Sequence, residues 1–165
     1  WLGFDGGGLC KMSQVEDHFE TSAFRFHQFK ANEDAENSIS HNTVLSICEG
    51  NYNTIWVGTF GGGLNKLNLK TNKFEIFSES EGLTNNNIYG IIKDESDHLW
   101  ISTNFGISEF ITESNTFRNY NEGNGLQSNE FNNNSYFQSS SGRIYFGGIN
   151  GFNYFSKFKN SCVII

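Results

Sequence analysis

The sequence has no proline and few charged residues, and each shortage limits what the chain can be. Charged residues make up 18% of the 165 residues, whereas asparagine (23) and glycine (18) are abundant. Without proline, glycine and asparagine must make the turns. No hydrophobic run is long enough to cross a membrane, and the mean hydropathy is -0.47. The aromatic content of 16% argues against a disordered chain.

Basic residues are outnumbered by acidic ones, which excludes some partners. Eleven Lys and Arg face 18 Asp and Glu, and the formal net charge is -7. Nucleic acids and anionic lipid surfaces attract basic stripes, so we expect neither as a partner of this chain. The chain starts at Trp1, inside an expected strand and without a signal peptide. We therefore expect it to be a piece of a longer protein.

Cysteines, histidines and catalytic motifs are also scarce. Cys10, Cys48 and Cys162 include no CxxC pair, so we expect single buried thiols and neither a zinc site nor a disulfide framework. There is no GxSxG, HExxH, P-loop or GxGxxG motif. Asp94 and Asp97 have the oxygens that calcium prefers, but their spacing is typical of a turn. The four histidines lack the spacing of metal ligands: His18, His27, His41 and His98. We expect no cofactor, no metal and no enzymatic activity.

What the sequence does have is a repeat, which starts each time with an aromatic residue. It reads WLGFDGGGL, WVGTFGGGL, WISTNFGI and YFGGINGF, and the four lead residues are Trp1, Trp56, Trp100 and Tyr145. The steps between them are 55, 44 and 45 residues. A second aromatic pair recurs near the end of three repeats: Phe26 and Phe29, Phe74 and Phe77, Phe117 and Tyr120. The longer first step comes from insertions in two connections.

Each repeat contains four short runs that are typical of β-strands. In the second repeat these runs are Val44–Glu49, Ile55–Thr59, Leu64–Leu69 and Phe74–Ser78. They alternate between apolar and polar residues, and Gly61–Gly63 supplies a tight reversal. Four strands at this period form one blade of a β-propeller. Helical repeats lack the required periodicity here, and a β-sandwich would not repeat at a fixed period.

We therefore predict an all-β chain that forms about three and a half propeller blades. The first blade lacks its innermost strand, and no outer strand is recognisable after Phe155, which leaves fourteen strands. The end blades of such an arc are expected to expose unpaired edges and apolar faces. The expected boundaries are 1–30 for part of blade 1, 39–78 for blade 2, 83–121 for blade 3, 126–158 for blade 4, and 159–165 for a following segment.

Two sets of repeated residues are expected to serve the fold. The lead aromatics Trp1, Trp56, Trp100 and Tyr145 are large enough to fill the space between stacked blades. Asn42, Asn86 and Asn129 lie two residues before each innermost strand. Their amides either bind loop backbone or form a ring that faces a ligand, and we favour the first interpretation because the position repeats.

The repeats resemble those of the two-component regulator propeller family. The resemblance rests on Val44–Ile47, Ile55–Thr59, Gly61–Asn65 and Phe74–Phe77, and on Gly82–Ile88 with Leu99–Thr103. Gly125–Asn132 followed by Tyr145–Phe155 is similar to that family's final blade, after which Cys162–Ile165 would begin a new domain. Ser102 departs from the family, where glycine is usual, and Gly50–Thr54 replaces an acidic-glycine turn.

The resemblance implies a function. In that family the repeats build the extracytoplasmic sensor of hybrid histidine kinases from Bacteroidetes. It thus implies a periplasmic sensor fragment that detects carbohydrate-derived ligands and regulates glycan-use genes. The expected partners are an oligosaccharide or other small molecule, and the remaining blades of the parent protein or another copy. Two alternatives stay open: the propeller of a glycosidase or polysaccharide lyase, and a structural or protein-binding propeller.

Ligand specificity is expected where the repeats differ. The hairpin between the second and third strands of each blade varies most. It gives six candidate ligand-binding residues, with ordinary turn residues as the alternative: Thr59, Phe60, Asn104, Phe105, Ile149 and Asn150.

Overall fold

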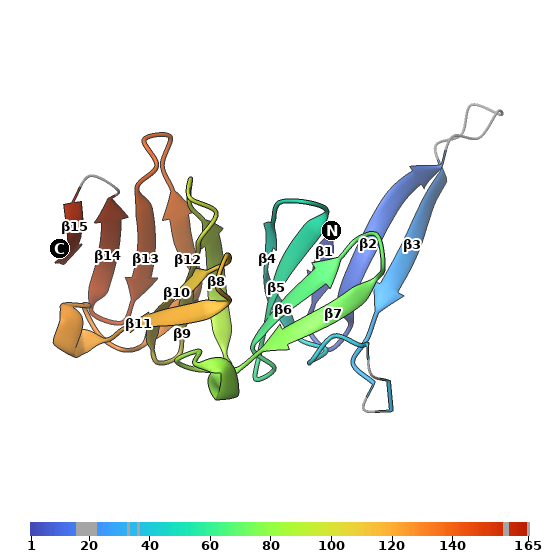
Figure 1. Ribbon diagram of the computed structural model, residues 1–165, viewed down its shortest axis with the longest axis horizontal. Coiled ribbons are helices and arrows are strands. Elements are labelled where there is room, and N and C mark those ends of the chain that lie inside the picture. Colours follow the sequence, from blue (N-terminus) through green and yellow to red (C-terminus); the bar gives the residue numbers. More distant parts are fainter. Residues whose placement is uncertain (16–22, 33, 36, 157–158, 165) are drawn as a thin grey trace.

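The computed structural model describes residues 1–15, 23–32, 34–35, 37–156 and 159–164, and for 15, 156 and 159–164 the backbone alone. In this part of the chain, fifteen strands form four antiparallel sheets, which follow one another along the sequence (Figure 1). We call these sheets blades 1 to 4. His18, Ile165 and the side chain of Cys162 lie outside the described residues.

Each blade is a meander in which neighbouring strands pair in chain order. Blade 1 holds β1 (Leu2–Phe4), β2 (Gly8–Val15) and β3 (Ala23–Phe29), and blade 2 holds β4 (Val44–Glu49), β5 (Thr54–Thr59), β6 (Leu64–Asn68) and β7 (Lys73–Phe77). Blade 3 holds β8 (Ile88–Lys93), β9 (Leu99–Thr103), β10 (Gly106–Ile111) and β11 (Thr116–Tyr120). Blade 4 holds β12 (Phe131–Gln138), β13 (Ile144–Gly148), β14 (Gly151–Ser156) and β15 (Lys159–Ile164).

The predicted all-β fold is confirmed, and every predicted strand boundary in blade 2 lies within one residue of the observed one. The predicted strand count is wrong in one place. We expected no outer strand in blade 4 and a following segment at 159–165, but β15 pairs with β14 as the fourth strand of that blade. The sequence signal failed because no aromatic pair like Phe74 and Phe77 follows Phe155.

Because the chain has no proline, glycine forms its tight turns. Gly63 has φ of 73°, and a Cβ there would lie 2.4 Å from the carbonyl oxygen of Phe77 in the neighbouring strand. Asparagine takes the same left-handed backbone region in the turns between third and fourth strands, at Asn72 (φ 54°) and Asn115 (φ 53°). Both residue types tolerate positive φ better than other residues do.

Three hydrophobic clusters hold the blades together, one at each junction between neighbours. The cluster between blades 2 and 3 joins Trp56, Leu64 and Phe77 of the first to Ile101 and Phe110 of the second. The repeat places equivalent residues at the other junctions. Leu9 and Phe29 pack against Val57 and Leu67, and Trp100 and Ile107 pack against Phe146 and Phe155. Tyr145, the fourth lead aromatic, instead contacts Phe152 and Tyr154 on the far side of blade 4.

The first blade departs most from the others in shape. Strands β2 and β3 are eight and seven residues long, and they project beyond the other blades as an arm (Figure 1). This arm contains the larger of the two insertions that lengthen the first repeat. No helix among the described residues is long and apolar enough to span a membrane.

Candidate functional site

The turns that carry the predicted binding residues lie beside the linkers between blades. The backbone N–H of Gly8 donates to the carbonyl of Asn42 (2.7 Å), that of Gly63 to Asn86 (3.0 Å), and that of Gly106 to Asn129 (2.6 Å). In each case the turn after a blade's second strand is bonded to the linker into the next blade. We call the side of the arc formed by these turns and linkers the linker face.

The repeated asparagines fix this arrangement through their side chains. The Oδ1 atoms of Asn42, Asn86 and Asn129 accept hydrogen bonds from the backbone N–H groups of Ala31 (2.8 Å), Glu79 (2.9 Å) and Glu122 (2.8 Å). Each amide therefore binds the linker in which it lies, where the chain leaves one outer strand and enters the next inner strand. A hydrogen bond from the backbone N–H to the side chain is typical of asparagine in turns.

One of the six candidate binding residues does not reach the surface. Thr59 is fully buried, and its hydroxyl donates to the carbonyl of Gly63 at 2.9 Å. Thr103 occupies the same place in blade 3 and donates to the carbonyl of Gly106 at 3.0 Å. Both residues are the last of the second strand, and their side chains point inward and bond the turn. Only the exposed residues of the turn can therefore contact a ligand.

The other five candidates are exposed on the linker face. Phe60, Phe105 and Ile149 each lie in a different turn, and the exposed fraction of these three side chains is between 49% and 56%. Turns usually carry polar residues and glycine, so a large apolar residue in three successive turns is unusual. The linker face therefore presents a row of apolar side chains that the fold itself does not cover.

Amide groups lie beside this apolar row. Asn104 is exposed next to Phe105, and its Oδ1 accepts a hydrogen bond from the phenol of Tyr89 at 3.2 Å. Asn150 is exposed next to Ile149, and its backbone N–H donates to Gln127 at 2.7 Å. Ligand sites commonly combine apolar surface with a few positioned polar groups, and this face offers both.

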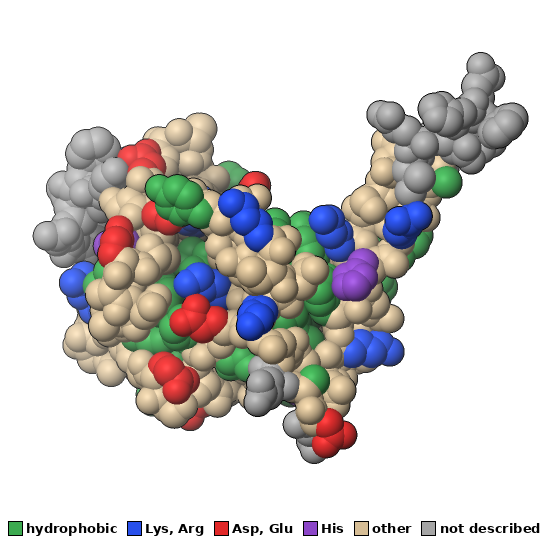
Figure 2. Space-filling view, turned by 45° about the vertical axis from the view of Figure 1, so that its right-hand side comes forward, with side chains coloured by type: hydrophobic (Ala, Val, Ile, Leu, Met, Phe, Trp, Pro, Cys, Tyr) green, Lys and Arg blue, Asp and Glu red, His purple; other side chains and the backbone are tan. Residues whose placement is uncertain are grey.

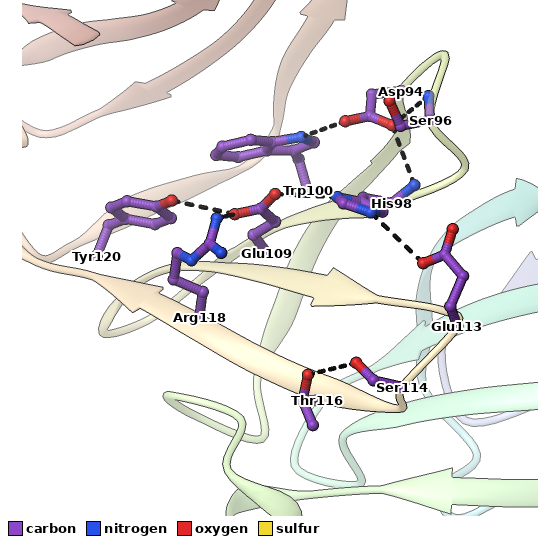
Figure 3. A network of polar contacts seen from close by, with 10 residues as sticks. All are labelled: Asp94, Ser96, His98, Trp100, Glu109, Glu113, Ser114, Thr116, Arg118 and Tyr120. Carbon is purple, nitrogen blue, oxygen red and sulfur yellow. Dashed lines mark hydrogen bonds and ion pairs between the residues drawn. The ribbon is translucent and has the colours of Figure 1, made fainter. Parts of the chain in front are cut away.

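Carboxylates, a histidine and a tyrosine converge at a second place, which the sequence analysis missed. Glu109 of β10 is almost fully buried, and it accepts hydrogen bonds from Arg118 Nη1 (2.9 Å) and the phenol of Tyr120 (3.0 Å). The imidazole Nδ1 of His98 lies 3.0 Å from the other carboxylate oxygen, and its Nε2 lies 3.5 Å from Glu113 (Figure 3).

This network is closed, so it does not support the catalytic alternative. Both oxygens of Glu109 are already bonded to protein groups. Burial raises the pKa of the Tyr120 phenol above its ordinary value, which keeps it a hydrogen-bond donor. A glycosidase needs two carboxylates that flank a substrate. Glu109 instead ties the third and fourth strands of blade 3 together beside Trp100 and Tyr120, which stack at 5.7 Å.

A shallow groove lies on the side opposite the linker face, where the innermost strands end. Its volume is about 430 Å³, and it is lined by Cys48, Glu49, Ile91, Ile92, Lys93, Tyr136, Phe137 and Gln138. The ring of Tyr136 lies against Gly90, where a Cβ would approach it to 2.3 Å. Lys93 is paired with Asp97 at 3.2 Å. The groove is therefore largely apolar, and the ammonium group of Lys93 is already paired with a carboxylate.

The titratable groups of the groove are not reactive ones. Burial raises the pKa of the Cys48 thiol, although the backbone N–H of Lys93 lowers it in part, and burial also raises the pKa of the Tyr136 phenol. Both groups therefore stay protonated at neutral pH. No group of three or more His, Cys, Asp and Glu suited to a metal ion is found in the described part of the chain.

The raised pKa of Cys48 predicts slow alkylation. Because less thiolate is present at a given pH, the pH at which alkylation by iodoacetamide reaches half its maximal rate is expected to lie above the ordinary thiol pKa of about 8.5. Mass spectrometry of the Cys48 peptide measures this rate. The same chain in denaturant serves as the control and should return to the ordinary value. A midpoint at or below that value in the folded chain would contradict the assigned burial effect.

Known proteins share both the repeat and the fold. Residues 38–61 and 82–105 match the two component regulator propeller family. A histidine kinase, P4, from Formosa agariphila is 31% identical over 70 residues, which is 42% of this chain and 5% of that protein.

Two solved structures that resemble this chain are from B. thetaiotaomicron. The extracellular domain of the one-component system BT4673 superposes with a TM-score of 0.70 at 20% identity, over 96% of this chain and 22% of that one. A structure of the extracellular domain of BT4673 described as a hybrid two-component system gives 0.63 at 22% identity, over 79% and 17%. The chain thus spans a small part of each relative. These likenesses show the propeller fold, and residues 38–61 and 82–105 are similar to two-component regulator propeller repeats.

Proposed function

We propose that this chain is part of the extracytoplasmic propeller of a two-component sensor, and that it contributes to ligand detection without catalysing a reaction. The matched repeats and the kinase named among its relatives support this assignment. The similar structures are described as extracellular domains of signalling systems, which supports a location on the outer side of the cytoplasmic membrane, in the periplasm. Blades 1 to 4 would then be one segment of a longer sensor, with β15 as the outer strand of blade 4.

The linker face is the proposed binding surface. The observation that carries this proposal is the row of exposed apolar residues in the turns of three successive blades: Phe60, Phe105 and Ile149. About half of each side chain remains exposed to water, and full burial of an apolar side chain is worth about 1.5–3 kcal/mol. A ligand that covers them recovers that energy. Asn104 and Asn150 supply amides next to the same surface.

We propose a carbohydrate-derived ligand for this surface. An aromatic ring that is open on one face packs well against the C–H groups of a sugar ring, and neighbouring amides can both donate to and accept from hydroxyl groups. The formal net charge of -7 disfavours an acidic polymer as ligand, unless another part of the parent protein supplies the cations. In the parent protein, binding would regulate glycan-use genes through the kinase domains.

The proposal predicts that two exposed aromatic residues carry binding energy. Using isothermal titration calorimetry, the complete sensor region would be titrated with neutral oligosaccharides chosen from a glycan array. Combined Phe60→Ala and Phe105→Ala substitutions are expected to weaken the affinity at least tenfold, which corresponds to about 1.4 kcal/mol.

Phe137→Ala is the matched control for this experiment. Phe137 is also an exposed aromatic residue, but it lines the groove on the opposite side. Its substitution is expected to leave the affinity unchanged. Unchanged binding by the Phe60 and Phe105 variant, with binding lost in the Phe137 variant, would move the site to the groove and overturn the assignment of the linker face.

A further inference from the structure

The innermost strand of blade 4 differs from those of blades 2 and 3 at its linker-face end. In blades 2 and 3 this strand has a bulge of one extra residue. In blade 4 the bulge is longer, because the stretch from Phe131 to Tyr136 of β12 lies opposite only Gly148 to Phe146 of β13. Gly148 directly precedes the turn of blade 4, so the bulge lies at the linker face. Bulges change the direction of side chains and are frequent beside functional sites.

The bulge presents three consecutive asparagines, Asn132, Asn133 and Asn134. All three are exposed, and Asn134 has the left-handed φ of 58° that asparagine tolerates. Their side chains form no hydrogen bond with another residue of the described part of the chain, unlike the linker asparagines, which bind backbone. An amide can both donate and accept hydrogen bonds, so the bulge offers groups that suit hydroxyls.

A further amide on the neighbouring strands is held in one orientation. Strand β8 runs beside β12, and the ring of Tyr136 lies against Gly90. At the linker-face end of β8, the phenol of Tyr89 donates to Asn104 Oδ1 at 3.2 Å. Burial raises the pKa of the Tyr89 phenol and the charge of Glu130 raises it further, so the phenol stays a donor at neutral pH. Because its oxygen is engaged, Asn104 has its NH₂ group left to donate to a ligand.

Glu130 adds a negative charge beside these amides. It directly precedes β12, and it is exposed. Its carbonyl accepts a hydrogen bond from the N–H of Ile149 at 3.4 Å, and the carbonyl of Asn129 accepts one from Gly106 at 2.6 Å. Residues 129 and 130 therefore connect the turn that carries Phe105 with the turn that carries Ile149. Glu130 thus lies where the polar groups and the apolar row meet.

The corresponding residues of the other two linkers are uncharged. Thr43 and Asn87 also directly precede an innermost strand. The hydroxyl of Thr43 donates to Asp5 at 3.0 Å and accepts from the N–H of Gly6 at 3.2 Å, so it is used within the turn of blade 1. An exposed acid at this position therefore distinguishes the linker between blades 3 and 4.

The described cations of blades 3 and 4 are engaged elsewhere. Lys93 and Arg118 form ion pairs with other carboxylates, and the guanidinium of Arg143 lies over the ring of Tyr154. Figure 2, in which the linkers run along the lower edge as in Figure 1, shows acidic and uncharged side chains at its lower left and no Lys or Arg there. An anion that approaches Glu130 would therefore meet its full negative charge.

We propose that Tyr89, Asn104, Glu130 and the bulge Asn132–Asn134 form a polar subsite that binds a neutral sugar unit and rejects acidic sugars. The amides would donate to and accept from hydroxyl groups, and the Glu130 carboxylate would accept from them. A carboxylate on the ligand would instead face a like charge, which is a common way to reject a competitor. This inference rests on the proposed function, because it assumes that a carbohydrate binds at the linker face.

The test compares a neutral oligosaccharide with its acidic counterpart on the complete sensor region. The neutral oligosaccharide that binds most tightly is oxidised to carboxylates at its primary hydroxyl groups, and calorimetry gives both affinities. The unmodified protein is expected to bind the neutral form about tenfold more tightly. Glu130→Gln keeps the size of the side chain and removes its charge. It is expected to reduce this ratio about fivefold, through tighter binding of the acidic form.

Glu122→Gln is the matched control. Glu122 is exposed in the same linker, but it follows the outer strand β11 instead of preceding the inner strand. Removing one charge there is expected to leave the ratio of affinities unchanged. As a second readout, Asn132→Ala combined with Asn133→Ala should weaken binding of the neutral form about fivefold.

The outcomes separate this subsite from the proposed function. If binding of the neutral form still depends on Phe60 and Phe105, but Glu130→Gln leaves the ratio unchanged, the subsite is refuted and the linker face remains the binding surface. An equal change in Glu122→Gln would assign the discrimination to net charge and would also refute it. Full affinity in the variant with both asparagines replaced would remove the bulge from the site. If no oligosaccharide binds, the carbohydrate ligand and the subsite are both refuted.

Discussion

Phe110→Ala is expected to lower the free energy of unfolding of this chain by about 4 kcal/mol. Phe110 is fully buried in the junction between blades 2 and 3. Its ring lies 4.8 Å from that of Phe77, 5.4 Å from Trp56 and 4.7 Å from Phe117. Truncation therefore leaves a cavity where two blades meet, and three rings lose contacts at once. Domains are stable by only about 5–15 kcal/mol, so the loss would be a large part of the total.

Urea unfolding, followed by tryptophan fluorescence, measures this change. Phe105→Ala is the matched control, because Phe105 is exposed in the turn between β9 and β10 and its loss should change the stability by about 0.5 kcal/mol or less. Phe110→Leu keeps most of the volume and should cost less than about 1.5 kcal/mol, which keeps the comparison informative if the alanine variant does not fold. Similar costs for Phe110→Ala and Phe105→Ala would contradict the packing of blades 2 and 3.

Glu109→Ala is expected to lower the free energy of unfolding by about 3 kcal/mol. The substitution leaves the Arg118 guanidinium, the Tyr120 phenol and the His98 imidazole without the carboxylate that they share. Tyr120 and His98 are partly buried, so water replaces that partner only in part. Glu109→Gln keeps an oxygen that can accept hydrogen bonds, and it should recover part of the loss.

Blade 2 offers a matched control at the same position of the repeat. Lys66 and Glu75 face each other across β6 and β7 as Glu109 and Arg118 do across β10 and β11, with the signs of the charges exchanged. The Lys66–Glu75 pair, at 3.0 Å, is more exposed. Glu75→Ala should therefore cost about 1 kcal/mol or less. If Glu109→Ala and Glu75→Ala lower the free energy of unfolding equally, the buried network contributes no more to stability than a surface ion pair does.

The period of the sequence was sufficient to predict the blades, because the lead aromatics and glycine turns recur at every junction. It could not reveal β15, whose residues have no counterpart of Phe74 and Phe77. The period also did not show that the Thr59 side chain is buried. Thr59 belongs to a variable hairpin, but it is the last strand residue, and the alternation of the strand turns its side chain inward.

The Glu109 network shows a different limit. Its members come from two strands, β10 and β11, and from the loops that hold His98 and Glu113, and a carboxylate in a strand gives no sign of which neighbours it meets. The exchange of Lys66 and Glu75 for Glu109 and Arg118 was visible in the repeat, and it could have indicated a cross-strand ion pair. That the Glu109 carboxylate is buried in blade 3, whereas both members of the pair in blade 2 are partly exposed, is not specified by the sequence pattern.

Hydrogen exchange on the complete sensor region, with and without a bound oligosaccharide, tests the central claim most directly. The claim is that the linker face is where this propeller meets its ligand. Exchange is expected to slow in the turns at residues 60–63, 104–106 and 149–151, which carry the exposed apolar row. Slowing confined to residues 48–49, 91–93 and 136–138, which line the groove on the opposite side, would contradict it.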